Sequence, residues 1–327
     1  MKILVTGSSG HLGEALVRTF RDSGQEVIGL DIKESPFTTI VGSVHDGQSV
    51  KRAMAGVQQV FHTATLHKPH VVTHSKQDFV DTNVSGTLVL LEEAVANDVG
   101  VFVFTSTTSM FGDALRPPSG TPAAWVTEDV KPIPKNIYGV TKTAAEDLCK
   151  LFHRQHGLNC IILRTSRFFP EEDDDKLKRA AFSDENTKAN EYLFRRVELE
   201  DVVSAHIAAA NRASDLGFGR YIISATTPFQ QEDLLALNCN APEVLRKRVP
   251  AYYDIYQQLG WIMFDKIDRV YVNDAARADL GWKPKYDFTY MLECLKEGSY
   301  PLSPISKTVG SKGYHKQVFK DGPFPVS

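Results

Sequence analysis

The stretch LVTGSSGHLG, residues 4–13, decides the fold of this chain of 327 residues. Three glycines stand three apart in it: Gly7, Gly10 and Gly13. An apolar segment, residues 2–7, precedes the turn, and a segment with helical spacing follows it. Glycines placed like this, between a buried strand and a helix, are typical of a turn that holds the phosphates of a dinucleotide.

Each glycine has a physical reason in that interpretation. Gly7 allows a sharp turn with positive φ. The missing side chain of Gly10 lets a pyrophosphate approach the helix N-terminus, where free N–H groups and the helix dipole favour negative charge. Gly13 lets the helix lie close to the sheet. An ordinary tight turn is the alternative, and an acid at the end of the second strand distinguishes the two.

Asp31 is that acid, because it ends a second predicted strand, residues 26–31. A carboxylate there accepts hydrogen bonds from the ribose hydroxyls and repels a 2′-phosphate. The predicted cofactor is therefore NAD, whereas Lys33, close by, keeps NADP as an alternative.

Strands and helices alternate through the first half of the sequence. Strands are predicted within residues 57–64 and over 101–107, 159–166 and 219–225. Helices are predicted over residues 14–24, 83–98, 138–157 and 197–213. The alternation predicts an α/β fold with a doubly wound, parallel Rossmann-type sheet and a smaller, mostly helical C-terminal substrate domain. The dinucleotide-binding domain is expected at 1–166, completed by about 197–225, with the substrate-binding part at 167–196 and 226–298 and a tail at 299–327.

Composition excludes several classes of function. The net charge of −3 gives no basic excess for a nucleic-acid partner. No apolar run reaches the roughly 20 residues that cross a bilayer, so a cytoplasmic protein without membrane contact is expected. The four cysteines form no metal-binding pair. The acidic run 171–176 lacks the turn glycine of a calcium loop, so it is interpreted as a solvated loop, and no metal is predicted.

Tyr138 and Lys142 lie four residues apart on a predicted helix, hence on one face of it. A hydroxyl-rich stretch, TSTTS at 105–109, ends the strand before that helix. With these motifs the sequence resembles the extended short-chain dehydrogenase/reductase family, also called the NAD-dependent epimerase/dehydratase family. The resemblance rests on TGSSGHLG, VFHTAT (60–65), NVSGTLVLLEEA (83–94), FTSTTSMFG (104–112), YGVTK (138–142), ILRTSRFF (162–169) and VELEDVVSAH (197–206).

The resemblance implies a role for each matching residue. Tyr138 would be the general base, Lys142 would bind the nicotinamide ribose and lower the tyrosine pKa, and Thr107 would bind the substrate oxygen. Further contacts to the cofactor would come from Ser9, His11, Leu12, Val44, Thr63, Ala64 and Thr65. Asn83 is expected to organise the backbone.

The sequence departs from family dehydratases, whose catalytic threonine is followed by two acids. Here Thr108 and Ser109 follow Thr107, which argues against water elimination. The segment between residues 166 and 197 is short for an enzyme that closes over a nucleotide sugar. It is more weakly similar to uronate dehydrogenases of the same family, whose substrate-binding positions would fall on His67, Thr107, Ser109, Arg167 and Lys176.

Two of these substrate residues have a plain structural alternative. His67 fits a surface histidine equally well, and Arg167 fits an ion pair with the acidic run that follows it. A guanidinium at Arg167 would otherwise hold a carboxylate or a phosphate.

The predicted function is NAD-dependent oxidation of a hydroxyl of a sugar, a sugar acid or a polyol. The alternatives are a nucleotide-sugar epimerase that keeps NAD bound and a non-catalytic NAD sensor. The resemblance also implies a homodimer formed through the helices at 83–98 and 138–157, although the apolar faces of those helices could equally serve the sheet of one monomer.

Overall fold

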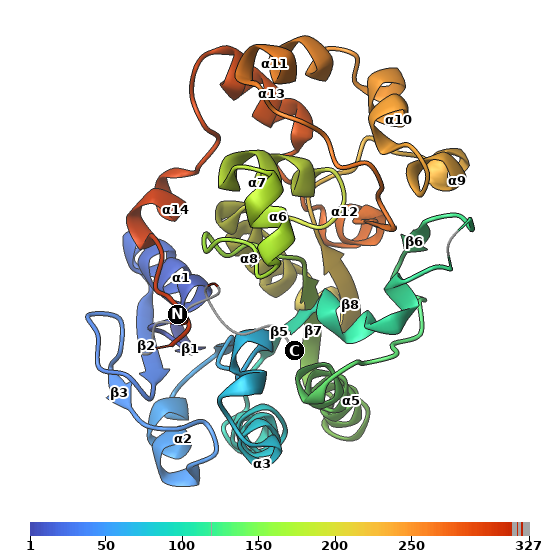
Figure 1. The fold of residues 1–327 in the computed structure, drawn as a ribbon. Helices are drawn as coiled ribbons and strands as arrows, with labels where there is room; N and C mark the ends of the chain where they lie inside the picture. The colour runs from blue at the N-terminus through green and yellow to red at the C-terminus, as the bar shows by residue number, and fades with distance from the viewer. Residues whose placement is uncertain (119, 316–318, 320–321, 323–327) are drawn as a thin grey trace.

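The structure, a computed structural model, describes residues 1–118, 120–315, 319 and 322. Among these residues, seven parallel strands form a central sheet in the order β3-β2-β1-β4-β5-β7-β8 (Figure 1). The strands are Lys2–Thr6 (β1), Glu26–Asp31 (β2), Ile40–Val41 (β3), Gln59–His62 (β4), Val101–Thr107 (β5), Asn159–Thr165 (β7) and Phe218–Ile223 (β8). The chain order reverses between β1 and β4, which is where open parallel sheets bind ligands.

Helices cover both faces of this sheet, as the doubly wound prediction requires. One face carries α1 (His11–Asp22), α8 (Leu199–Leu216), α12 (Asp274–Leu280) and α14 (Pro304–Val309). The other carries α2 (Gly47–Met54), α4 (Gly86–Ala96) and α5 (Ile137–His156), with α3 (Lys76–Val80) and a π-helical turn, Asp81–Ser85, leading into α4. The predicted fold class is confirmed.

Strand β5 shows why its residues form a central strand. Val101 and Val103 pack into the core on the α1 and α8 side, whereas Phe102 and Phe104 pack into the core under α4 and α5. Successive side chains point to opposite faces of a strand, so a strand buried on both faces needs an unbroken apolar run.

A second hydrophobic core gathers most of the remaining helices at one end of the molecule (Figure 1). These helices are α7 (Asp184–Tyr192), α9 (Leu234–Leu237), α10 (Ala241–Arg248), α11 (Tyr252–Leu259) and α13 (Phe288–Lys296), with α6 (Lys176–Ala181) beside them. Two short strands, β6 (Ala124–Val126) and β9 (Arg269–Tyr271), pair in parallel next to this core. The sequence analysis missed both strands, because three residues are too few to show a periodic pattern.

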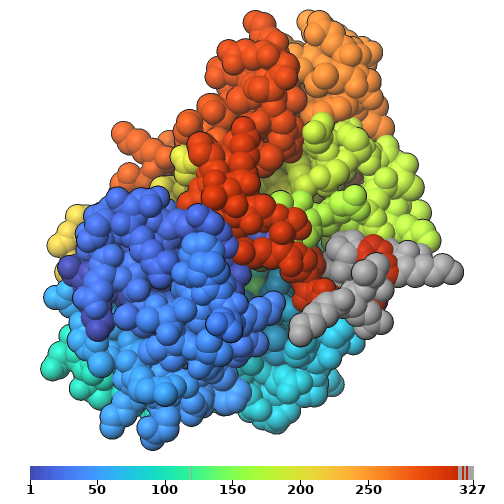
Figure 2. All heavy atoms as spheres, turned by 90° about the vertical axis from the view of Figure 1, so that its left-hand side faces the viewer, coloured from blue at the N-terminus to red at the C-terminus, as the bar shows by residue number. Residues whose placement is uncertain are grey.

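The C-terminal segment returns to the first helix. After α14, residues 311–315, here called the C-terminal strap, run from α1 to the segment that follows β4. Figure 2 shows this red segment passing between the blue N-terminal part and the yellow-green α6 and α7. The predicted tail therefore contains a helix and a docked strap, and its residues after 315 lie outside the described ones apart from 319 and 322. Within the described part of the chain, no helix is long and apolar enough to cross a membrane.

Candidate cofactor and catalytic site

The glycine-rich turn has the geometry that its sequence predicts. Gly7 has a φ of +70°, and its N–H donates to the carbonyl of Leu30 on β2 at 2.8 Å. A Cβ on Gly7 would lie 2.7 Å from the backbone nitrogen of Ala64. A Cβ on Gly13 would lie 1.9 Å from the carbonyl oxygen of Gly7, so the crowding that excludes a side chain there comes from the turn itself.

Gly10 is less crowded than Gly7 and Gly13 and lies on the open side of the turn. A Cβ on Gly10 would meet only the carbonyl oxygen of Gly7, at 3.2 Å, among the described atoms. Gly10 is also the N-cap of α1, and no described side chain caps that helix. An uncapped helix N-terminus beside open space suits a phosphate group. The turn thus fits the pyrophosphate of a dinucleotide.

Asp31 lies beside this turn at the end of β2. Its carboxylate accepts hydrogen bonds from the backbone N–H groups of Ser9 and Lys33, both at 2.9 Å. The hydroxyl of Ser9 bonds in turn to Ser35 and Thr38, both at 2.9 Å. Each carboxylate oxygen keeps a further lone pair, so Asp31 can still accept from ribose hydroxyls.

The remaining predicted cofactor residues lie at or near the ends of the strands around the turn. Thr63 donates its hydroxyl to the carbonyl of Thr6 at 2.7 Å, and Ala64 donates its N–H to the Thr6 hydroxyl at 3.2 Å. Thr65 donates its hydroxyl to Asn83 at 3.0 Å, and Asn83 also bonds to the backbone N–H and carbonyl of the next residue, both at 2.9 Å. Leu12 and Val44 are buried in the two cores that flank the sheet.

Tyr138 and Thr107 lie together at the carboxyl end of the sheet. The Tyr138 side chain, 8% exposed, lies next to the Thr107 side chain. The Thr107 hydroxyl accepts from the backbone N–H of Ser109 at 3.1 Å. Burial raises the pKa of Tyr138 to about 12, against a smaller lowering by the neighbouring Thr107 side chain. The phenol is therefore protonated at neutral pH in this structure.

Lys142 follows Tyr138 by one helical turn and is almost fully buried. Its ammonium group donates to the carbonyl of Thr105 on β5 at 2.6 Å and lies 3.9 Å from the centre of the Phe104 ring. Burial lowers the pKa of Lys142 to about 7, against an opposing effect of the Glu146 carboxylate. The expected lowering of the Tyr138 pKa by this lysine is therefore not found here, because burial dominates the pKa of Tyr138 and Lys142 bonds to the strand.

Beneath Lys142, Glu146 forms a buried ion pair with Arg164 of β7, at 2.9 Å between Oε2 and Nη2. Ser106 donates its hydroxyl to the same carboxylate at 2.6 Å. These contacts join β5, α5 and β7 directly below the catalytic candidates, and they fix the orientation of α5.

His67 contacts aromatic rings from two distant segments. It stacks on Phe169 with ring centres 5.2 Å apart, and its ring lies 5.2 Å from that of Tyr314 in the C-terminal strap. Burial, followed by the nearby His70, lowers the pKa of His67 well below its usual value. His67 is thus a neutral, half-buried member of an aromatic cluster. The side chain of Ser109, another predicted substrate residue, is exposed.

Arg167 adopts the structural alternative that its sequence suggested. Its guanidinium lies 3.1 Å from Asp173 and 3.6 Å from Asp174 and donates to the carbonyl of Glu172 at 2.9 Å. The expectation of a solvated acidic loop is wrong for Glu171 and Asp173, which are buried because they meet cations and backbone donors. The side chain of Lys176, at the start of α6, is exposed.

Glu171 holds the C-terminal strap against α1. Its Oε1 accepts from the hydroxyl of Ser311 at 2.9 Å and from the N–H groups of Lys312 and Gly313 at 3.1 and 3.0 Å. The Nε2 of His11, at the start of α1, lies 3.0 Å from the same oxygen. Burial alone would raise the pKa of Glu171, but the hydrogen bond from His11 and its other partners lower it to about 2.

The strap then continues toward the segment after β4. Lys312 forms an ion pair with Glu14 of α1, Nζ to Oε2 2.5 Å. The ring of His315 bonds to the carbonyl of Pro69 at 3.0 Å. The strap thus bridges the glycine-rich turn and the loop that carries His67.

Sequence reasoning missed Phe169 and Glu171 as site residues and found no role for the strap. Both residues stood in quoted motifs, but nothing in the local pattern linked them to positions more than 140 residues away, such as Gly313. Within the described residues, no group of three or more histidines, cysteines and acids could hold a metal ion.

The sequence is similar to that of several known proteins. The sequence model of the NAD dependent epimerase/dehydratase family matches residues 3–215. A dTDP-glucose 4,6-dehydratase of Streptomyces antibioticus is 27% identical over 88% of this chain and 89% of its own length. An uncharacterized protein of Sinorhizobium fredii, y4nG, is 32% identical over 49% of this chain, and the match spans only 39% of that relative.

A solved structure shares the fold over almost the whole chain. It is a short-chain dehydrogenase/reductase superfamily protein of Agrobacterium tumefaciens with bound NAD. The two chains are 22% identical, with a TM-score of 0.63, over 94% of this chain and 99% of that one.

Proposed function

Because the chain belongs to the NAD-dependent epimerase/dehydratase family and its cofactor is NAD, we propose that it transfers a hydride at a hydroxyl-bearing carbon of a sugar, a sugar acid or a polyol. The observation that carries this proposal is the buried pair of neighbouring side chains Thr107 and Tyr138, with Lys142 one helical turn away. A phenol, a hydroxyl and an ammonium group at the carboxyl end of a parallel sheet form an acid–base centre for alcohol and carbonyl chemistry.

The cofactor would lie along the features already described. The N-terminus of α1 would hold its pyrophosphate, and Asp31 its adenosine ribose. Lys142 would reach the nicotinamide ribose by giving up its bond to the carbonyl of Thr105. NAD, when bound, accepts the hydride and places a positive charge near the phenol.

The chain's own residues would handle the proton. In the oxidative direction the Tyr138 phenolate removes the hydroxyl proton, and Thr107 holds the substrate oxygen in place. In the reductive direction the neutral phenol, the form present at neutral pH in this structure, donates its proton to the carbonyl oxygen. The raised pKa of Tyr138 therefore favours reduction at low pH and oxidation at high pH.

Substrate contacts are proposed for His67, Ser109, Arg167 and Lys176. Arg167 is already paired with Asp173 and Asp174, so an anionic substrate would have to compete with these carboxylates. A neutral sugar or polyol faces no such competition. Water elimination is not proposed, because Thr108 donates its hydroxyl to the carbonyl of Thr165 and supplies no acid next to Thr107.

A specific observation favours an epimerase as the second candidate function. The C-terminal strap lies across the first turn of α1, where the cofactor would bind. A strap in this place would slow the release of NADH, and retained NADH can return its hydride to the other face of the intermediate. The short segment between residues 166 and 197 instead favours a dehydrogenase acting on a small substrate.

One experiment separates these functions. The purified protein is incubated with NAD and a panel of uronates, aldoses, polyols and nucleotide sugars, while NADH absorbance and sugar composition are followed together. Net NADH formation supports the dehydrogenase, and interconversion of sugars without NADH supports the epimerase. Binding of NAD with neither reaction across the panel would overturn the enzymatic proposal and leave a sensor.

We also propose that two copies of the chain pair through α4 and α5. On α5, Val140 is 50% exposed and Leu151 is 39% exposed, so part of this helix presents apolar side chains to solvent. Light scattering should give the mass of a dimer, and Val140→Glu should shift it toward the monomer.

A further inference from the structure

A cavity of about 340 Å³ lies on the side of the sheet opposite to α5. It is formed by α7, the start of α8, and residues 300–310 around α14. Phe168 lines it and packs against the α1 and α8 core, whereas Tyr138 and Lys142 come from α5 on the other face. The cavity is therefore separate from the proposed catalytic centre.

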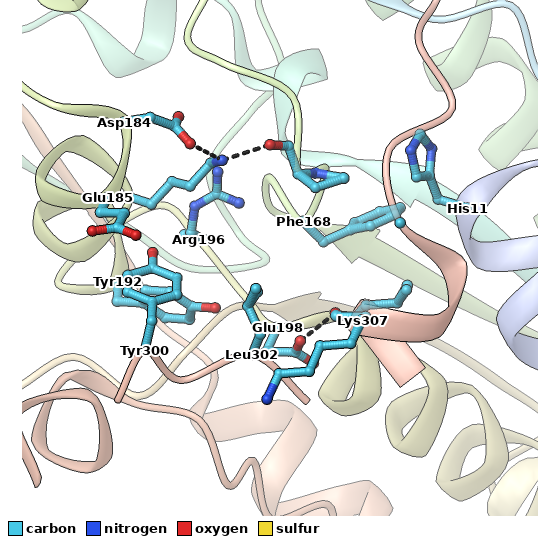
Figure 3. A pocket seen from close by; sticks show the side chains of 15 residues that line it. His11, Phe168, Asp184, Glu185, Tyr192, Arg196, Glu198, Tyr300, Leu302 and Lys307 are labelled. Carbon is cyan, nitrogen blue, oxygen red and sulfur yellow. Dashed lines mark hydrogen bonds and ion pairs between the residues drawn. The ribbon is translucent and has the colours of Figure 1, made fainter. Parts of the chain in front are cut away.

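Two phenol groups reach into this cavity (Figure 3). Tyr192 is 5% exposed, and no described residue makes a hydrogen bond with its hydroxyl. The hydroxyl of Tyr300 likewise has no hydrogen-bond partner among the described residues. Burial raises the pKa of Tyr192 well above its usual value, so this hydroxyl remains a donor. Neither hydroxyl is fully buried, so both are open to the cavity and available to a ligand that enters it.

A carboxylate oxygen in the same wall is also without a partner. The Oδ2 of Asp184 is paired with Lys188, but its Oδ1 is buried and accepts no hydrogen bond from the described residues. Because this oxygen is buried beneath the wall, the groups that the cavity offers to a ligand are the two tyrosine hydroxyls, each of which can donate and accept a hydrogen bond.

The two buried cations of the wall are already compensated, whereas Lys307 and Glu185, both exposed, line its rim without a described ion pair. Arg196 pairs with Glu191 at 3.1 Å and donates to the carbonyl of Phe169 at 3.1 Å. Lys188 bonds to Asp184 and to the carbonyl of Pro170. Both buried cations are thus satisfied within the protein, and an anionic ligand would have to break an existing ion pair. A neutral ligand would not.

We propose that this cavity binds a neutral, hydroxyl-rich molecule of the size of one monosaccharide or cyclic polyol. Its hydroxyls bond to Tyr192 and Tyr300, and its C–H faces lie against the rings of the tyrosines and Phe168. A volume of about 340 Å³ is at the lower end of the roughly 300–1,000 Å³ of ligand pockets, which suits a single ring. The proposed ligand contacts include none of the catalytic residues, although His11, a predicted cofactor contact, and residues of the predicted substrate-binding part also line the cavity.

The probes are D-glucose and myo-inositol, and binding is measured by saturation-transfer NMR and by titration in the presence of excess NAD. The double variant Tyr192→Phe/Tyr300→Phe should raise the Kd of the bound probe at least tenfold. It should leave the Tm unchanged or higher, because no existing hydrogen bond is lost. The matched control is Tyr253→Phe, a tyrosine that is 37% exposed and does not line the cavity.

The catalytic variant Tyr138→Phe shows where the probe sits. The proposal expects this variant to bind the probe like the wild type. Loss of binding in Tyr138→Phe but not in the double variant would place the probe at the active site and overturn the proposal. Equal binding by the wild type and the double variant, or no binding of either probe, would also overturn it. All of these outcomes are measured as binding and need no catalytic turnover. They can therefore be told apart from a failure of the enzymatic proposal.

Discussion

Replacing Glu171 by Gln should release the C-terminal strap from α1. This carboxylate accepts hydrogen bonds from Ser311, Lys312 and Gly313, and it also meets His11. The amide of Gln has about the same size but carries no charge and has only one acceptor oxygen. The substitution therefore weakens all four contacts without leaving a large cavity.

The magnitude follows from the pKa of Glu171. A fall from 4.5 to about 2 means that the ionised carboxylate is held more strongly than the neutral one by about 3 kcal/mol. His11 of α1 supplies the largest share of this lowering, so only part of that energy belongs to the strap contacts, and roughly one order of magnitude is expected in the equilibrium between docked and released strap. Because the pKa is lowered, the contribution is complete above pH 4.5 and is lost as the pH falls toward 2.

Hydrogen exchange at the backbone amides of Lys312 and Gly313 measures this directly. Both amides should exchange roughly ten times faster in Glu171→Gln than in the wild type at neutral pH. The matched control is Glu172→Gln, since the exposed side chain of Glu172 makes no described hydrogen bond. Equal exchange rates in the two variants would refute the idea that this carboxylate anchors the strap. Faster NAD release in Glu171→Gln, followed by stopped-flow fluorescence, would show that the strap also controls the cofactor.

Further outcomes are expected at the catalytic and cofactor residues. Tyr138→Phe should lower kcat at least about a hundredfold while NAD affinity in a fluorescence titration stays within about twofold. The oxidation rate should rise about tenfold per pH unit from pH 7 to 9, because the pKa of Tyr138 is raised to about 12 and only its phenolate accepts the proton; a flat profile would contradict this role. Asp31→Ala should raise the Kd for NAD about tenfold and reduce the preference for NAD over NADP, as measured by parallel titrations with the two cofactors. Arg164→Met should destabilise the protein by about 3–5 kcal/mol in urea unfolding, because Glu146 would remain buried without its cation.

The sequence predicted the parts of the molecule whose cause is local. The turn at Gly7 needs a positive φ, and that requirement is visible as a glycine. Strand β5 is buried on both faces, so its sequence contains a run of apolar residues from which a central strand can be predicted. The proximity of Tyr138 to Lys142 was predicted from their spacing on a helix. The position of Thr107 at the site was predicted because the carboxyl ends of parallel strands lie at one edge of the sheet.

The parts that could not be predicted depend on partners far apart in the sequence. The acidic run reads as solvent-exposed because its composition is charged, yet Asp173 is buried against Arg167 and Arg195. The strap is rich in small and polar residues and carries no periodic signal, but Glu171 anchors it from about 140 positions away. The lowering of the Tyr138 pKa also failed as an expectation, because spacing along a helix gives proximity and says nothing about burial.

The pairing of β6 with β9 has a consequence for how this protein can be divided. Residues 124–126 belong to the segment between β5 and α5, yet they are hydrogen-bonded to residues 269–271, which follow all the strands of the large sheet. A fragment that stops after β8 would keep β6 but expose its hydrogen-bonding edge to other molecules. Expression of the N-terminal portion by itself should therefore yield aggregated material, and functional dissection of this enzyme needs point substitutions in the intact polypeptide.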